Sequence, residues 1–307
     1  MANNKDNETM YAVVGASGNT GRIVAEQLLA AGKKVRAIGR NADHLKALAD
    51  KGAEPFIASI EDKSALTKAF TGVQAVYSMI PPSMVEDQTS YVNKVGEALA
   101  GAVAGAHVPY VVNLSSMGAA SEDAPGFMAD MYRQEQRLNR LPDSVSVVHL
   151  RPSMFMENFL ASINAIKKAG VIAYPIRPDI AIPMIATQDI ASEAARLLLG
   201  LNFSGKSTKA LFGQRDVSMA EVAKIIGRAI NKDVRYVQAP YEEHIKTLVQ
   251  AGIPLDVANT LTGLYRRMNE GTGVSREKRT SENTTPTSFE QFAQKFAAIY
   301  NNGGEAQ

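Results

Sequence analysis

The segment Met10–Gly21 constrains the fold of this chain more than any other part of the sequence. A short apolar run typical of a buried strand opens it, three glycines follow, and an amphipathic run predicts a helix over 22–31. The glycines are Gly15, Gly18 and Gly21. Glycine lets backbone N–H groups approach an anion, and a helix N-terminus attracts negative charge. Strand, glycine turn and helix together therefore predict a phosphate-binding loop.

Apolar runs of strand length alternate with helical periodicity along the first half of the chain. We predict further strands over 34–38, 54–57, 75–80, 110–114 and 144–150. Helices are predicted between them, around 45–49 and over 62–70, 90–106 and 128–141. This alternation predicts an α/β fold with a Rossmann-type, doubly wound parallel sheet.

The pattern becomes less regular after residue 152. Helices are predicted over 157–169, 187–199, 218–230, 241–250, 256–270 and 288–300, strands over 209–213 and 234–237, and loops over 171–183 and 271–286. Ser218 and Ser288 each begin a capping box, and Thr187 is expected to cap its helix. We therefore expect a smaller α/β C-terminal substrate lobe.

The expected domain boundaries follow this change in pattern. A nucleotide-binding domain spans 9–155, and 182–215 returns to it. The smaller substrate lobe comprises 156–181 and 216–300. The polar ends, 1–8 and 301–307, are expected to form flexible tails.

Composition argues against several classes of protein. The 307 residues carry a net charge of +2 without a Lys/Arg block, so we expect no nucleic-acid partner. The absence of cysteine excludes disulfides, and the four scattered histidines lack metal-ligand spacing, so we expect no metal site. Because no signal peptide or membrane-spanning run is recognisable, we expect a cytoplasmic protein without membrane contact. Small residues in the helix at 90–106 would allow a homodimer.

In an open parallel sheet, ligands bind beyond the carboxyl ends of the strands. Residues at these ends are therefore the candidates for cofactor binding. They are Gly15, Ala16, Ser17, Gly18, Asn19, Thr20, Gly21, Arg22, Arg40, Asn41, Ser59, Ile60, Met79, Ile80, Pro81, Asn113, Leu114, Pro152, Ser153, Met154 and Phe155.

Arg40 identifies the expected cofactor. In NAD-binding versions of this fold, an acid at the end of the second strand binds the ribose 2′-hydroxyl, whereas an arginine suits the 2′-phosphate of NADP. Arg40 lies at that strand end, 19 residues after Gly21, and no acid occupies the position. The sequence therefore predicts NADP(H), with help from Arg22; a solvated surface arginine is the alternative.

Ser115 and Tyr132 are the candidate catalytic residues. Ser115 ends a buried strand and could bind a substrate carbonyl, or it satisfies backbone groups at the turn. A tyrosine needs a nearby cation to lower its pKa from about 10 before it can exchange a proton near neutrality. Position 136, one helical turn after Tyr132, is Gln, and none of the ten tyrosines has Lys four residues later. Proton transfer by Tyr132 is therefore the less favoured interpretation.

A second group of residues is expected to contact the substrate. Some follow the strand that ends near 114, and others form an apolar wall after residue 155 with one polar side chain among them. They are Ser116, Met117, Asn158, Phe159 and Tyr174. Most apolar residues in such positions belong to a core, which is the alternative.

Five spaced motifs resemble the NmrA-like group of atypical short-chain dehydrogenases/reductases. They are Gly-Ala-Ser-Gly-Asn-Thr-Gly-Arg at 15–22, Gly-Arg-Asn at 39–41, Leu-Ser-Ser-Met-Gly-Ala at 114–119, Leu-Arg-Pro-Ser-Met-Phe-Met-Glu-Asn at 150–158 and Pro-Met-Ile-Ala-Thr-Gln-Asp-Ile-Ala at 183–191. The resemblance implies a Rossmann domain, a small C-terminal lobe and binding of NADP(H). The group includes NADPH-dependent quinone oxidoreductases, other reductases and dinucleotide-binding sensors. The Tyr-x-x-x-Lys pair of the wider superfamily is absent here.

Three functions stay open. The first is NADPH-dependent reduction of quinones or related conjugated carbonyl compounds, which needs little acid catalysis. The second is a non-catalytic NADP(H) sensor that binds a protein partner. The third is a carbonyl or imine reductase with non-standard catalytic residues. The first and third imply a small-molecule carbonyl or quinone substrate.

Overall fold

A computed structural model describes residues 9–81, 83, 85, 87–124, 126–272 and 277–302. The expected tail 1–8, most of the tail 301–307 and residues 273–276 of the expected loop lie outside the described residues. The chain divides into two compact units. The first comprises Met1–Ser83, Asp87–Arg151 and Ile190–Lys209, and the second comprises mainly Pro152–Asp189 and Ala210–Gln307.

A seven-stranded sheet with the order β10-β6-β5-β4-β1-β2-β3 forms the centre of the first unit. Its strands are β1 (Met10–Val14), β2 (Lys34–Gly39), β3 (Glu54–Ile57), β4 (Val73–Met79), β5 (Tyr110–Leu114), β6 (Ser146–Pro152) and β10 (Lys206–Leu211). Strands β6 to β3 in this order pair in parallel. The predicted Rossmann-type α/β sheet is confirmed, and the order reverses between β1 and β4, where ligands bind in such folds.

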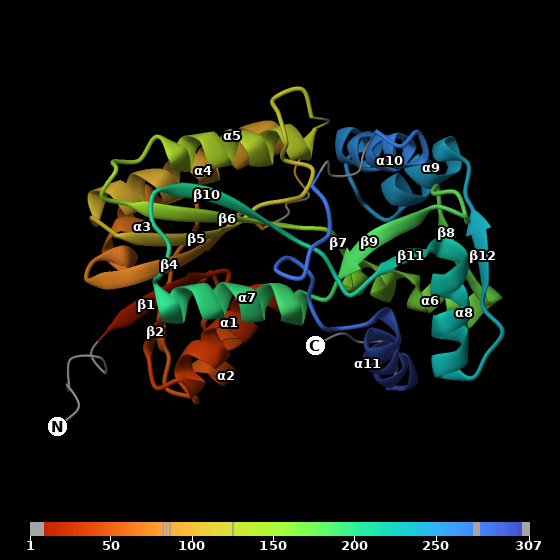
Figure 1. Cartoon of the computed structure of the whole chain (residues 1–307), viewed down its shortest axis with the longest axis horizontal. Coiled ribbons are helices and arrows are strands. Elements are labelled where there is room, and N and C mark those ends of the chain that lie inside the picture. The colour runs from red at the N-terminus through yellow and green to blue at the C-terminus, as the bar shows by residue number, and fades with distance from the viewer. Residues whose placement is uncertain are drawn as a thin grey trace. The chain divides into compact units, whose positions relative to one another are not determined.

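Helices cover both faces of this sheet (Figure 1). They are α1 (Asn19–Ala30), α2 (Ala42–Ala49), α3 (Lys63–Phe70), α4 (Gln88–Gly105), α5 (Phe127–Asn139) and α7 (Thr187–Gly200), which begins in the second unit. Helices α3, α4 and α5 lie on one face, and α1, α2 and α7 lie on the other. Because β1 is sandwiched between helices, four of its five residues are fully buried apolar side chains.

The second unit contains two small sheets and a helical layer. Its strands are β7 (Met154–Phe155), β8 (Val171–Tyr174), β9 (Ala181–Ile185), β11 (Asp216–Ser218) and β12 (Arg235–Gln238). Its helices are the 3₁₀ segment η1 (Met156–Ser162), α6 (Ile163–Ala169), α8 (Met219–Ile230), α9 (Tyr241–Gln250), α10 (Leu255–Asn269) and α11 (Phe289–Asn301). The core is apolar and aromatic, with Phe159, Phe289 and Phe296 fully buried.

The expected loop over 171–183 is wrong at both ends, where strands β8 and β9 form, and holds only for 175–180. Strand β8 precedes the first proline of that stretch, and β9 includes Pro183, which pairs with Asp216 in an antiparallel ladder. Three prolines suggested a loop, but β9 tolerates one because its other residues supply the ladder bonds. The capping boxes at Ser218 and Ser288 are confirmed. At the start of α7, the Glu157 carboxylate accepts the Thr187 backbone N–H at 3.0 Å.

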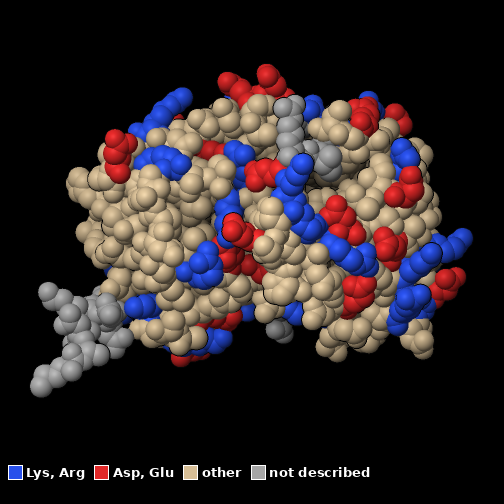
Figure 2. All heavy atoms as spheres, in the orientation of Figure 1, with Lys and Arg blue, Asp and Glu red and all other residues tan. Residues whose placement is uncertain are grey.

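The face drawn in Figure 2 shows no concentration of one charge among its described residues. Over the described atoms of the face drawn in Figure 2, Lys and Arg side chains are interspersed with Asp and Glu. Within the described part of the chain, no helix is both long and apolar enough to cross a membrane.

Candidate functional site

The glycines after β1 form a tightly packed turn. Gly15 has a φ of +65°, and its carbonyl accepts the Gly18 N–H at 2.9 Å. A Cβ on Gly21 would lie 2.3 Å from the Gly15 oxygen, so only glycine lets α1 pack against the turn. The predicted glycine turn is therefore a tight loop that leads directly into α1.

The N-terminus of α1 is open. Its first turn contains no acid, and its N-cap, Gly18, has no side chain to cap the free N–H groups. In contrast, side-chain oxygens of Asn41, Asp62 and Asp87 cap α2, α3 and α4. The uncapped N–H groups and the helix dipole favour an anion, so this loop fits a dinucleotide diphosphate.

The neighbouring strands hold the loop in place. The Ala16 N–H donates to the Ile38 carbonyl at 3.2 Å, and the buried Thr20 hydroxyl accepts from the Tyr77 hydroxyl at 2.8 Å. On the β4 side, a Cβ added to Gly15 would lie 2.8 Å from the Met79 sulfur. The structure thus brings Met79 against the loop, while Ser17 and Asn19 stay exposed.

Arg40 is exposed at the end of β2 and has no ion-pair partner among the described residues. Its neighbours are already paired: Arg36 binds Glu54 at 2.9 Å, and Arg22 binds Glu26 at 3.2 Å. The Asn41 side chain accepts the Asp43 N–H at 2.8 Å as the cap of α2. Arg22 and Arg40 are the two cations predicted to bind the 2′-phosphate. Of these two, Arg40 is therefore the one without an ion pair among the described residues.

The ends of β3 and β4 contribute mainly backbone and apolar surface. Ile60 and Ile80 are buried, whereas Ser59 is exposed and its hydroxyl accepts the Glu61 N–H at 3.2 Å. The Pro81 carbonyl accepts the Tyr91 hydroxyl at 3.3 Å. These residues can form a wall, but their polar groups mostly stabilise the turns themselves.

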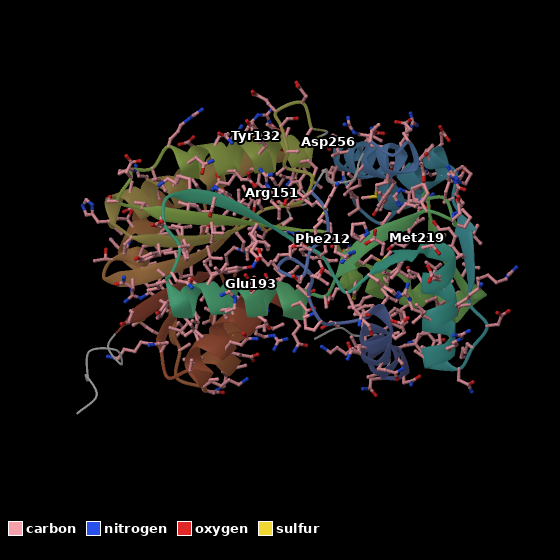
Figure 3. All side chains as sticks on the ribbon, in the orientation of Figure 1. Tyr132, Arg151, Glu193, Phe212, Met219 and Asp256 are labelled. Carbon is pink, nitrogen blue, oxygen red and sulfur yellow. The ribbon has the colours of Figure 1, made fainter. Side chains whose placement is uncertain are left out.

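The Ser115 hydroxyl is turned toward α5. It donates to the Glu135 carboxylate at 2.5 Å, and Arg151 binds both oxygens of the same carboxylate at 2.9 and 2.5 Å. Glu135 is 1% exposed. Figure 3 shows Tyr132 on α5 and Arg151 at the end of β6. The serine proton is therefore already engaged, by a helix side chain and not by the backbone groups of the turn that the sequence suggested.

A second buried polar group lies two residues earlier, at Asn113. The Asn113 amide nitrogen is 3.1 Å from His149 Nδ1, and His149 Nε2 is 3.0 Å from the Asn139 oxygen. Burial lowers the pKa of His149 to about 4, although the charge of Glu135 opposes the shift. His149 is therefore neutral near pH 7. Leu114, between Asn113 and Ser115, is half-buried.

The sequence did not single out Glu135, Arg151 or His149. The polar character of Arg151 was visible at a strand end, but its partner, Glu135, stands on a helix without any local signal. Only the packing of α5 on β5 and β6 brings them together.

The remaining candidates of the first unit are half-buried. The Ser116 hydroxyl accepts the Gly118 N–H at 3.3 Å and lies 3.1 Å from the Met128 sulfur, so it stabilises its own turn. Met117 and Tyr132 are partly exposed, and Tyr132 packs against the core with its ring. Gln136, one turn after Tyr132, supplies no charge to it.

The candidates of the second unit form a separate group. Met154 and Phe155 belong to β7, and the buried Ser153 hydroxyl has no hydrogen-bond partner among the described residues. Phe159 is fully buried against Tyr174, with ring centroids 5.5 Å apart, and the Tyr174 hydroxyl donates to the Asn158 carbonyl at 3.1 Å. Phe159 and Tyr174 thus lie in the core, the alternative left open for an apolar wall. Pro152 is buried, and Asn158 is exposed.

Within the described ranges, no group of three or more His, Cys, Asp or Glu side chains could hold a metal ion.

Comparison with known proteins places these features in context. The model of the NmrA-like family matches residues 7–293. A (4-alkanoyl-5-oxo-2,5-dihydrofuran-3-yl)methyl phosphate reductase of Streptomyces griseus is 27% identical over 266 residues, 87% of this chain and 89% of the relative. An NAD(P)H azoreductase of Xenophilus azovorans is 25% identical over 256 residues, 83% and 86% of the two chains.

Solved structures share the fold. The NADPH-dependent quinone oxidoreductase of Escherichia coli, solved with NADPH, superimposes with a TM-score of 0.75 at 24% identity. The match covers 94% of this chain and 99% of that one.

Proposed function

Because the chain belongs to the NmrA-like family, we propose that it is an NADPH-dependent oxidoreductase that reduces quinones or related conjugated carbonyl compounds. The observations that carry the proposal are the N-terminus of α1, which has no side-chain cap, and Arg40 at the end of β2, which has no ion-pair partner among the described residues. The reductase names of both curated relatives support the general reaction class.

Different residues of the first unit bind different parts of the cofactor. The Gly15–Gly21 loop and the first turn of α1 hold the diphosphate through backbone N–H groups. Arg40 holds the 2′-phosphate, for which its planar fork of donors is suited. NADPH supplies a hydride when it is bound, and the task of the chain is to orient the acceptor beside it.

The acid chemistry of the site favours a quinone over a simple ketone. Reduction of a quinone produces a phenolate, whose conjugate acid resembles tyrosine with a pKa of about 10. An alkoxide is far more basic, closer to water at about 15.7. Here Ser115 already donates to Glu135, and Tyr132 lacks a lysine one turn later. A substrate that needs little protonation, from Tyr132 or solvent, suits such a site.

Binding and turnover test the proposal separately. The dissociation constants of NADPH and NADH are measured by calorimetry, and NADPH oxidation is then followed with matched quinones, simple ketones and imines. We expect tighter binding of NADPH and turnover mainly with quinones. Oxidation only with ketones or imines would favour the conventional reductase, and failure of both nucleotides to bind would refute the assignment.

A non-catalytic NADP(H) sensor is the second candidate, favoured by the engaged proton of Ser115. A sensor binds NADPH as tightly but does not oxidise it with any acceptor in the panel. The same two measurements therefore separate the enzyme from the sensor.

A further inference from the structure

The loops that follow β2 and β3 lie side by side. Gly39 and Ile57 are register partners, and beyond them the Ala58 N–H donates to the Gly39 carbonyl at 3.0 Å. Arg40 follows Gly39 directly, and Glu61 lies in the loop after Ala58. The fold therefore places a carboxylate on the loop adjacent to the proposed 2′-phosphate ligand.

A lysine from α4 neutralises this carboxylate. Lys94 Nζ lies 2.7 Å from Glu61 Oε2, with 67% and 37% of the two side chains exposed. Exposed pairs of this kind contribute little to folding stability. The pair nevertheless decides whether the surface beside Arg40 carries an unbalanced negative charge.

The charges of Arg40 and Glu61 both act on the hydroxyl of Tyr91, on α4. Its half-buried hydroxyl donates to the Pro81 carbonyl, and burial raises its pKa. The charge of Arg40 lowers the pKa of the same hydroxyl, and the charge of Glu61 raises it. Arg40 and Glu61 therefore both lie close enough to act on a single point of α4, one helical turn before Lys94.

We propose that Lys94 is a specificity-determining residue that acts through Glu61: by neutralising this carboxylate, it keeps the neighbouring 2′-phosphate subsite selective for NADPH over NADH. This inference rests on the proposed function. A 2′-phosphate brings up to two negative charges to Arg40, whereas the 2′-hydroxyl of NADH brings none. An unpaired Glu61 therefore penalises NADPH more than NADH, which carries only the diphosphate charges.

The expected effect is moderate because the charges are separated by solvent. A unit charge several ångströms from a phosphate, screened by water and salt, changes affinity by about two- to fourfold. The effect should be largest at low ionic strength and should fade as salt is added.

The test compares dissociation constants of NADPH and NADH for Lys94→Gln, Glu61→Gln and the double variant of the full chain. We expect Lys94→Gln to lower the NADPH preference about two- to fourfold, with the smaller change in NADH affinity, and Glu61→Gln to raise the preference. The double variant should return to the wild-type preference.

Lys209→Gln is the matched control. Lys209 Nζ lies 2.6 Å from Glu193, but Lys209 belongs to β10, at the opposite edge of the sheet from β3. Its loss should leave the preference unchanged.

Two results would overturn the inference. Lys94→Gln could keep the wild-type preference, or the double variant could stay as unselective as Lys94→Gln alone, which would mean that Lys94 contacts the phosphate directly. Failure of the wild-type protein to bind either nucleotide would instead refute the proposed function.

Discussion

The strand ends of the seven-stranded sheet differ in whether their polar groups are paired with other groups of the protein. We call the strand ends after β1 and β2 the open region, and those after β5 and β6 the closed region. After β1 and β2, the first turn of α1 has no side-chain cap, and Arg40 has no ion-pair partner among the described residues. At the ends of β5 and β6, Ser115 and Arg151 both bind the carboxylate of Glu135, which stands on α5. The polar groups of the first region lack protein partners among the described residues, whereas those of the second are paired.

The difference follows from burial. A buried carboxylate or guanidinium is tolerated only when it is paired and hydrogen-bonded. Glu135 is 1% exposed and therefore needs Arg151, whereas Arg40 is solvated and needs no partner.

The largest effect is expected for Glu135→Ala. The change removes the carboxylate from Arg151 and Ser115, and breaking a buried pair costs about 3–5 kcal/mol. Urea denaturation measures the free energy of unfolding. Glu97→Ala is the control, because Glu97 pairs with Arg137 at 2.6 Å but is 72% exposed, so its loss should cost less than about 1 kcal/mol. Equal losses in the free energy of unfolding for the two variants would show that the buried network of Glu135 is no more stabilising than the exposed Glu97–Arg137 pair.

Arg40→Asp tests the open region. The variant removes a charge-assisted contact to the 2′-phosphate and offers an acceptor to the 2′-hydroxyl, so the NADPH/NADH affinity ratio should fall about 10- to 100-fold. Stability should stay within about 0.5 kcal/mol, since the side chain is exposed. Calorimetric titration measures both nucleotides, with Arg196→Gln on α7 as the control. Equal losses for NADPH and NADH would contradict a 2′-phosphate role.

Acid should destabilise the closed region through His149. Burial lowers the pKa of His149 to about 4 in the folded protein, from 6.5 in the unfolded chain. The unfolded chain therefore binds more protons between these values, so stability is complete above pH 6.5 and is lost as the pH falls toward 4. His149 alone should make the protein about 2 kcal/mol less stable at pH 5 than at pH 7.5. His149→Gln should remove that share of the pH dependence, and an unchanged slope would refute it.

The positions of the glycine turn and of Arg40 could be predicted because their signals are local, whereas their roles in cofactor binding stay predictions. The glycines of the turn and Arg40 are recognised from spacing along one βαβ unit, and the strand alternation sets the fold. The network of Ser115, Glu135 and Arg151 depends on three elements far apart in sequence, and no periodicity encodes that contact. The loop expected over 171–183 failed for the same reason: whether a proline fits a strand depends on the partner strand, here β11.

The smallest effect is expected for Tyr132→Phe. If the acceptor is a quinone, water can protonate the phenolate product, so kcat should fall less than about threefold and the affinity for NADPH should not change. A ketone would need the phenol proton far more, so its turnover should fall about 100-fold or more, within the usual range for general acid catalysis. The ratio of the two losses, measured on one preparation, compares the substrates without reference to folding. A large loss with quinones would show that Tyr132 supplies the proton despite Gln136, and that the chemistry depends on α5 after all.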